Sequence, residues 1–159
     1  MAATSNQLAA TLFDTVEREL AAFGLEVEAE ALRILKANGT DLTGRLRQSL
    51  TSRAERAASG LVRLVVQASA TDRGFPYPDA VNFGQKPHWG PIAPLIRWAK
   101  LRFRRSDPRE TYRIARGKQI AIAERGTEGT GFLSRPWEAL VPTLGARLAE
   151  AITDDLRAA

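Results

Sequence analysis

The sequence predicts an α+β fold, in which a long N-terminal helix and a small, mostly antiparallel sheet precede three C-terminal helices. Apolar residues recur at steps of three and four over residues 5–37, which is the stripe of an amphipathic helix. The pattern changes to alternation over residues 61–69, which is typical of a strand with one buried face. A helical period returns after residue 94. We therefore expect one domain over residues 1–159.

The N-terminal helix fills the first part of this domain, residues 1–40. We expect it to end at Asn38-Gly39, because a glycine supplies the left-handed residue that helix C-termini favour. Gly24 lies inside the helix and can kink or split it. The apolar stripe has eight members: Leu8, Leu12, Val16, Leu20, Phe23, Val27, Ala31 and Ile34.

Residues 41–84 are expected to form the strand-rich centre. In the strand over residues 61–69, the apolar side chains point to one face, whereas Arg63 and Gln67 point to the other. Residues 48–56 are the expected hairpin partner of this strand, although their alternation is weaker. Residues 71–74 break the strand.

Residues 85–131 are expected to form a basic helical insertion with loops. Residues 85–94 contain three prolines, and the last of them, Pro94, begins a helix that runs to about residue 103. Asp107 and Pro108 mark the start of a second helix, because they combine a capping side chain with a proline in the first turn. Three glycines in residues 126–131 then favour a flexible loop.

The last helix is expected over residues 132–159. Ser134 is the expected capping residue, and Pro142 lies far enough inside the helix to bend it. Its apolar face repeats with a helical period: Trp137, Leu140, Val141, Leu144, Leu148, Ile152 and Leu156.

The composition excludes several classes of site. The chain has no cysteine and one histidine, which excludes disulfides and a zinc site built from Cys and His. No apolar run approaches the ~20 residues that span a bilayer, and no signal peptide is evident at the N-terminus. We therefore expect no membrane contact, no cofactor and no metal.

Positive charge is concentrated in the middle of the chain. Residues 61–125 hold 13 basic and 5 acidic groups, and the segment 97–118 holds nine basic against two acidic. Trp98 lies in register with the apolar side of its helix and is expected in the core. The strongest candidates for external contacts are Arg102, Arg104, Arg105 and Arg109. DNA phosphates and an acidic protein surface both require this charge, and both interpretations stay open.

Catalytic chemistry has weak candidates only. His88 has no carboxylate nearby in the sequence, and its neighbours suggest a packed loop. The glycines of residues 126–131 lack the Gly-Lys-Ser/Thr ending of a phosphate-binding loop. Asp72, Asp79 and Asp107 can in principle bind Mg²⁺, but their spacing matches no known motif. We therefore expect a protein that is not an enzyme.

Three short motifs stand out by their order and spacing. Taken singly, each is compatible with an ordinary turn or with core packing. Their notable residues are Thr43, Gly44, Leu46 and Ser49 in the first motif, Tyr77, Ala80, Phe83 and Gly84 in the second, and Phe132 and Pro136 in the third. Asp41 or Thr43 can cap the short turn that follows the first helix.

Together the motifs resemble those of a phage morphogenesis family that includes head–tail joining, neck and tail-completion (tail-terminator) proteins of long-tailed phages. Residues 41–49 resemble its D-T-G-x-L-x-x-S element. Residues 77–84 resemble its Y-A-x-x-x-E-F-G element, with Pro78-Asp79 inserted and Asn82 where an acidic residue is usual. Residues 132–136 resemble the P-F-L-x-P-A element that opens the C-terminal helix.

The resemblance implies a small α+β virion protein without catalytic activity. Members of the family form rings, which suggests a hexamer for a tail terminator and a dodecamer nearer the portal. The implied partners are further copies of the chain, the adjoining neck or adaptor and tail-tube proteins, and passing genomic DNA, which is bound weakly and without sequence specificity. The implied location is the virion neck or tail, after assembly in the host cytoplasm.

Two other function classes remain as alternatives at this point. The first is a small basic DNA-binding protein that uses residues 97–118, although no helix-turn-helix or zinc-finger signature supports it. The second is a hydrolase or nuclease, which requires a metal or a base–nucleophile pair that the sequence does not clearly offer.

Overall fold

The computed structural model describes residues 5–39, 43–72 and 74–158. It confirms the α+β class. The helices are α1 (Ser5–Asn38), α2 (Arg45–Ser49), α3 (Pro78–Phe83), α4 (Ile92–Phe103), α5 (Pro108–Arg125) and α6 (Ser134–Ala158). The strands are β1 (Leu50–Arg56), β2 (Val62–Ala68), β3 (Thr71–Asp72), β4 (Phe75–Pro76), β5 (Gly84–Gln85) and β6 (Thr127–Glu128). They form three antiparallel pairs, β1–β2, β3–β4 and β5–β6.

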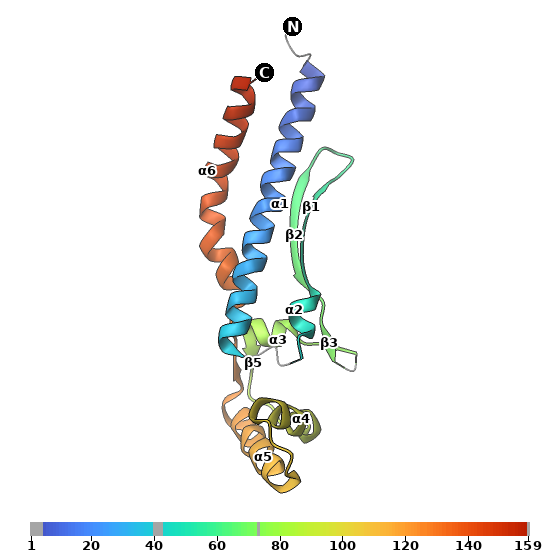
Figure 1. The fold of residues 1–159 in the computed structure, drawn as a ribbon, viewed down its shortest axis with the longest axis vertical. Helices are drawn as coiled ribbons and strands as arrows, with labels where there is room; N and C mark the ends of the chain where they lie inside the picture. The colour runs from blue at the N-terminus through green and yellow to red at the C-terminus, as the bar shows by residue number, and fades with distance from the viewer. Residues whose placement is uncertain (1–4, 40–42, 73, 159) are drawn as a thin grey trace.

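The molecule is elongated and consists of two parts (Figure 1). The larger part, which we call the body, contains α1, α2, α3, α6 and the β1–β2 hairpin. The smaller part, which we call the arm, is the α4–α5 helical hairpin of residues 92–125. Helix α1 begins and α6 ends at one end of the body, and the arm lies at the other end.

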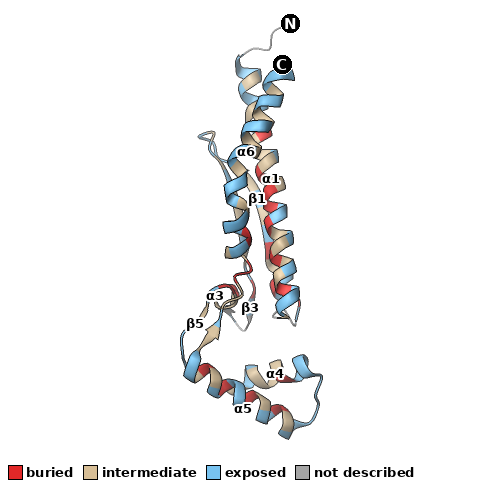
Figure 2. Cartoon of the chain, turned by 90° about the vertical axis from the view of Figure 1, so that its left-hand side faces the viewer, coloured by how far each residue is buried: buried red, intermediate tan, exposed pale blue. Residues whose placement is uncertain are grey.

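Helix α1 is the central layer of the body, with α6 along one side and the β1–β2 hairpin along the other (Figure 1). The apolar stripe predicted from the sequence is its buried side, where Phe23, Val27 and Ala31 are almost fully buried. Figure 2 shows buried positions, in red, recurring along α1. A helix covered on two sides needs a wide apolar stripe, which explains why the periodic signal was strong.

Gly24 does not break α1, which runs without interruption through this residue. Gly24 is buried against the hairpin instead: a Cβ there would lie 2.7 Å from Leu64 Cδ1 and 3.0 Å from Ser52 Cβ. The glycine therefore allows helix and strands to approach closely, and the kink that the sequence suggested is absent.

The β1–β2 hairpin is confirmed, and its register pairs Leu50 with Ala68 and Arg56 with Val62. Leu64 of β2 faces α1, where it lies beside Gly24. The opposite face carries charge: the carboxylate of Glu55 accepts a hydrogen bond from Arg63 Nε at 2.8 Å and also pairs with Arg53. The Arg63 interaction, followed by the charge of Arg53, holds the pKa of Glu55 below its usual range.

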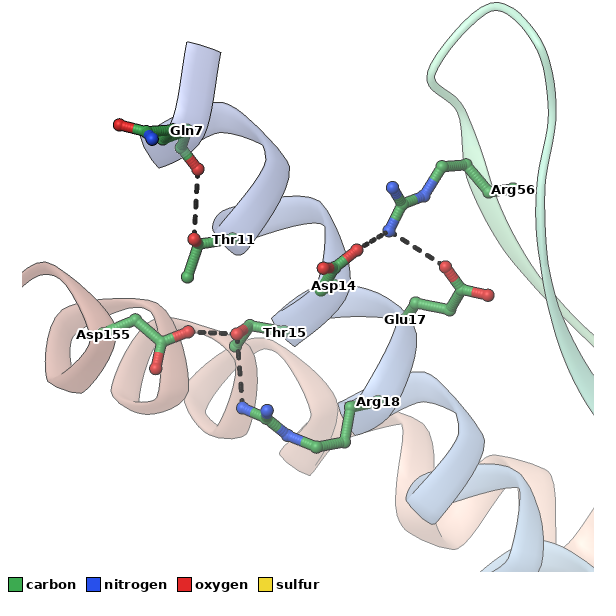
Figure 3. A network of polar contacts seen from close by, with 8 residues as sticks. All are labelled: Gln7, Thr11, Asp14, Thr15, Glu17, Arg18, Arg56 and Asp155. Atoms are coloured by element: carbon green, nitrogen blue, oxygen red, sulfur yellow. Dashed lines mark hydrogen bonds and ion pairs between the residues drawn. The ribbon is translucent and has the colours of Figure 1, made fainter. Parts of the chain in front are cut away.

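Helix α6 packs antiparallel to α1 through a mixture of ring and polar contacts. Near one end, Trp137 meets Phe23 edge-to-face with ring centroids 6.1 Å apart. Midway, Arg147 donates to Glu26 at 2.8 Å. At the far end Thr15 donates to the carboxylate of Asp155, as Figure 3 shows. Pro142 lies inside α6 without interrupting it.

Figure 3 also shows how the hairpin is joined to α1 on its other side. Arg56 donates to Asp14 at 2.7 Å and lies 3.0 Å from Glu17. These carboxylates raise the pKa of Arg56, with the Asp14 hydrogen bond as the largest cause. Charged residues of α1 thus bind α6 on one side of the helix and the hairpin on the other.

Candidate partner-binding surfaces

The three sequence motifs meet in one small core at the end of α1. Leu46 and Phe132 are fully buried together with Leu35 and Leu50, and Tyr77 packs against this cluster. Pro136 is also buried, at the start of α6. Residues from three distant stretches of the chain therefore form a single packing unit, which fixes how α2, α3 and α6 join.

The first motif is a turn into α2. Gly44 is the N-cap residue with φ 74°, a left-handed conformation that favours glycine. The N-cap residue Gly44 has no side chain to cap the helix, and the exposed Thr43 makes no capping hydrogen bond among the described residues, so the cap expected from Thr43 is wrong. Asp41, the other expected cap, lies outside the described residues. Ser49 closes the helix by donating to the Leu46 carbonyl at 2.9 Å.

The second motif is the short helix α3, and one residue differs from expectation. Tyr77, Ala80 and Val81 are half-buried, whereas Phe83 is 71% exposed. In a helix of six residues, the 100° step carries position 83 away from the face shared by Tyr77 and Val81. Phe83 is therefore a surface residue and takes no part in the core packing that this motif allowed.

Asn82 performs a function that the sequence did not reveal. Its buried side-chain oxygen accepts from the backbone N–H of Leu133 at 2.8 Å and of Ser134 at 3.2 Å. These N–H groups are among the donors at the start of α6 that have no carbonyl partner within the helix. Asn82 therefore caps α6 from α3, and Ser134, the expected cap, is the first helical residue.

Two strands of two residues link body and arm, and we call them the stalk (β5 and β6). Gly84 pairs with Glu128, and Gln85 with Thr127. Glycines allow the backbones to touch: a Cβ at Gly84 would collide with the Thr127 carbonyl, and one at Gly126 with the Gln85 carbonyl. Both glycines have left-handed φ, 78° and 76°.

The segment 126–131 is therefore ordered, contrary to the flexible loop that its glycines suggested. Both the N–H and the hydroxyl of Thr130 donate to the Val81 carbonyl, at 2.8 and 3.0 Å. The N–H of Gly131 donates to the Asn82 carbonyl at 2.9 Å. Two strands of this length carry no sequence periodicity, so the pairing was not predictable.

The arm is an antiparallel helix pair, and the start of α5 was predicted correctly. The side chain of Asp107 accepts from the Arg109 N–H at 3.0 Å and caps α5, which ends at Gly126. Helix α4 begins at Ile92, two residues before the expected Pro94. The loop before α4 packs on α5, because Gln119 donates to the Gly90 carbonyl at 2.6 Å.

The four arginines singled out from the sequence lie between the end of α4 and the first turn of α5, in different surroundings. Arg102 lies beside Gly39 at the end of α1, and Arg105 pairs with Glu110 at 3.7 Å. Arg104 ends α4 in a left-handed conformation, φ 49°. The side chain of Arg109 is exposed on α5.

A second set of cations on α5 was not singled out. Arg113 and Arg116 follow Arg109 at helical spacing, and all three are exposed. Arg116 is held in place, because its guanidinium lies 4.8 Å from the Trp89 ring centroid and donates to Gln119 at 2.6 Å. The four- and three-residue spacing was the sequence signal that could have found this face.

A cavity of about 420 Å³ lies between the body and the arm. Its lining includes Gly39 from the body and Trp98, Arg102, Lys118 and Glu128 from the arm and stalk. Trp98 is half-buried at the edge of this space and meets Phe103 edge-to-face. Trp98 therefore lines a junction, which differs from the closed core expected for it.

The residues with catalytic potential are dispersed. His88 is exposed, and its Nδ1 lies 2.9 Å from the Lys86 carbonyl. Asp107 caps a helix and Asp79 is exposed, while the side chain of Asp72 lies outside the described part. Within residues 5–39, 43–72 and 74–158, no three His, Cys, Asp or Glu side chains gather as a metal site would require.

The described helices include none with the length and apolar character needed to cross a membrane. Comparisons of the chain with protein-family models, with curated proteins and with solved structures found no match.

Proposed function

We propose that this chain is a structural subunit of a long-tailed bacteriophage that forms a ring at the head–tail junction. In this role it completes the tail or neck, joins the tail to the filled capsid and leaves a channel for DNA. Two observations support the proposal: the motifs that resemble the phage morphogenesis family, and an architecture whose surface is too large for an isolated subunit.

The chain has a larger accessible surface than a compact monomer of its mass. The chain exposes 10631 Å², whereas a compact monomer of 17.4 kDa is expected to expose about 7,900 Å². The excess is roughly 2,800 Å², and a standard interface buries about 800 Å² on each partner. Two standard interfaces on every subunit, as a ring requires, would cover about 1,600 Å², which is a little over half of this excess.

Exposed apolar side chains lie where such interfaces would form. Helix α6 has 25 residues but buries only Pro136, and it exposes Trp137, Val141 and Leu156. On α1 and the hairpin, Phe13, Leu25 and Leu61 are exposed. Large apolar side chains at the surface are typical of sites that another protein covers.

The layered body also offers two unlike sides. One side is formed by α6 and the other by the hairpin, with α1 between them (Figure 1). A head-to-tail contact joins unlike surfaces, and it closes into a ring when the rotation between subunits divides a full turn. The layer order therefore suits a cyclic assembly of identical copies.

The proposal is tested by sedimenting the purified chain with isolated tail tubes and with DNA-filled heads that lack tails. We expect the chain to co-sediment with one of these two particles. The number of bound copies should stand in a fixed ratio to the number of subunits in the terminal ring of that particle. Co-sedimentation with neither, under conditions that allow assembly of the remaining virion proteins, would refute the proposal. A monomer that binds free DNA instead would support the stand-alone DNA-binding alternative.

A further inference from the structure

We propose that the arm binds the phosphate backbone of duplex DNA through the exposed face of α5 and the adjoining end of α4. This inference names a partner for the proposed ring. It rests on the proposed function because that function brings duplex DNA next to the chain. The charge on the arm is a property of the single chain, and it can be tested separately from ring formation.

The charge of the arm is dense and unbalanced. Residues 92–125 contain ten basic and three acidic groups, which gives +7, whereas the whole chain carries +5. The remainder of the chain therefore carries −2. Of the three acidic groups, Asp107 caps α5 and Glu110 pairs with Arg105. Little negative charge is left to neutralise the arm.

Most cations of the arm contact no carboxylate within the described residues. This set comprises Lys100, Arg102, Arg104, Arg109, Arg113, Arg116, Lys118 and Arg125. In the body the opposite holds, since Arg56, Arg63 and Arg147 each pair with acidic side chains. The arm thus differs from the body in how its charges are used.

Like charges on one helix face destabilise the helix. Arg109 and Arg113 are four residues apart, and Arg113 and Arg116 are three apart, so their guanidinium groups repel one another. Glu110 is the one carboxylate between them in the sequence, and it pairs with Arg105 and with none of these three arginines, which leaves this repulsion in place. A bound polyanion would relieve it, which makes this face of α5 the preferred contact surface.

A second copy of the chain is a poor partner for the arm. Several carboxylates of the body, among them Glu26, Glu55 and Asp14, are already bound to arginines of the same chain. In a closed ring, moreover, all arms lie at the same level, so that +7 on each would face +7 on its neighbour. A polyanion on the ring axis would offset this repulsion.

Nucleic acid fits the arm better than an acidic protein does. Protein interface cores are depleted of charged residues, whereas protein–DNA interfaces are strongly positive. The exposed face of α5 offers guanidinium groups and the phenol of Tyr112, and it lacks the Asn or Gln pairs that read bases. Contacts to phosphate alone carry no sequence information and allow sliding, which suits DNA that must pass.

The test is fluorescence anisotropy of two short labelled duplexes of unrelated sequence, titrated with the full chain between about 50 and 200 mM salt. We expect equal affinity for both duplexes. If six phosphates are contacted, the logarithm of the binding constant should fall with the logarithm of salt concentration with a slope of about −5. Light scattering on the same samples reports the oligomeric state independently.

Two variants with the same charge change locate the site. The arm variant combines Lys100→Gln, Arg109→Gln and Arg113→Gln, and should reduce the slope by about 3. The control combines Arg33→Gln, Lys36→Gln and Arg157→Gln on the body, and should leave the slope nearly unchanged. Circular dichroism checks that both variants keep the helical content of the unmodified chain.

Three results would overturn the proposal. The first is an equal loss of affinity in the arm and body variants, which would indicate diffuse attraction by net charge. The second is tighter binding of poly-glutamate than of duplex DNA at the same salt, which would assign the arm to an acidic protein. The third is the absence of DNA binding at about 50 mM salt. A chain that forms rings but gives any of these results would leave the proposed function standing.

Discussion

At the scale of single residues, Asn82 connects α3 to the first turn of α6, which lies 51 residues later in the sequence. In the sequence this residue looked like a departure from a motif that usually carries an acid. The structure shows a polar acceptor aimed at helix N–H groups, which a carboxylate would serve equally well. A partner so distant leaves no local pattern, which is why sequence reasoning assigned the cap to Ser134.

Replacement of Asn82 by alanine should lower the free energy of unfolding by about 1–3 kcal/mol, because two buried N–H donors lose their acceptor. Asn82→Asp should retain most of the stability at neutral pH, since a carboxylate accepts the same bonds and suits the helix dipole. Urea unfolding measures both, with Asp79→Ala on exposed α3 surface as the control. Equal stability of Asn82→Ala and the control would contradict the capping role.

Glu55 should titrate below the usual range of a glutamate, because Arg63 and then Arg53 hold its pKa down. Carbon-detected NMR of the carboxyl group can measure this pKa, and Arg63→Gln should raise it. Because the pKa in the folded state is lower than in the unfolded state, the ion cluster stabilises the hairpin at pH values above the ordinary pKa of a glutamate. That contribution is lost as the pH falls through the folded pKa. An unshifted pKa would show that the cluster is absent in solution.

At the scale of elements, the sequence was informative where periodicity and end signals coincide. The limits of α5 were predictable because Asp107 and Pro108 start the helix and Gly126 ends it. The hairpin followed from the alternation in β2. The stalk was missed because β5 and β6 have two residues each, and their glycines also fit an open loop.

Gly24 and Gly145 are both inside helices of the body, but they should respond oppositely to alanine. Helix propensity alone favours alanine by about 1 kcal/mol at either site. At Gly24 the new Cβ would press on Leu64 and Ser52, so Gly24→Ala should destabilise the chain by about 1–3 kcal/mol. At Gly145 a Cβ meets nothing within 4 Å, so Gly145→Ala should stabilise it. Thermal unfolding of the two variants measures both changes in stability. A gain in stability for Gly24→Ala would contradict the close packing of α1 on the hairpin.

At the scale of the whole molecule, the sequence indicated the α+β class and the order of its elements. It did not indicate that α1 is the middle of three layers or that the arm projects from the body (Figure 1). The sequence predicted an apolar face on α6, and the structure leaves much of that face half-buried or exposed. Periodicity identifies the face of a helix that avoids water, and it does not distinguish cover by the same chain from cover by another.

The molar mass of the purified chain in solution distinguishes a ring from a single subunit. Static light scattering should be measured for the chain alone and with tail tubes or connectors. A ring of six subunits of 17.4 kDa would give about 104 kDa, and a ring of twelve about 209 kDa. We expect one of these discrete masses, either free or after transfer to the tail tube or connector. A mass of 17.4 kDa at every concentration and with every partner would contradict the ring.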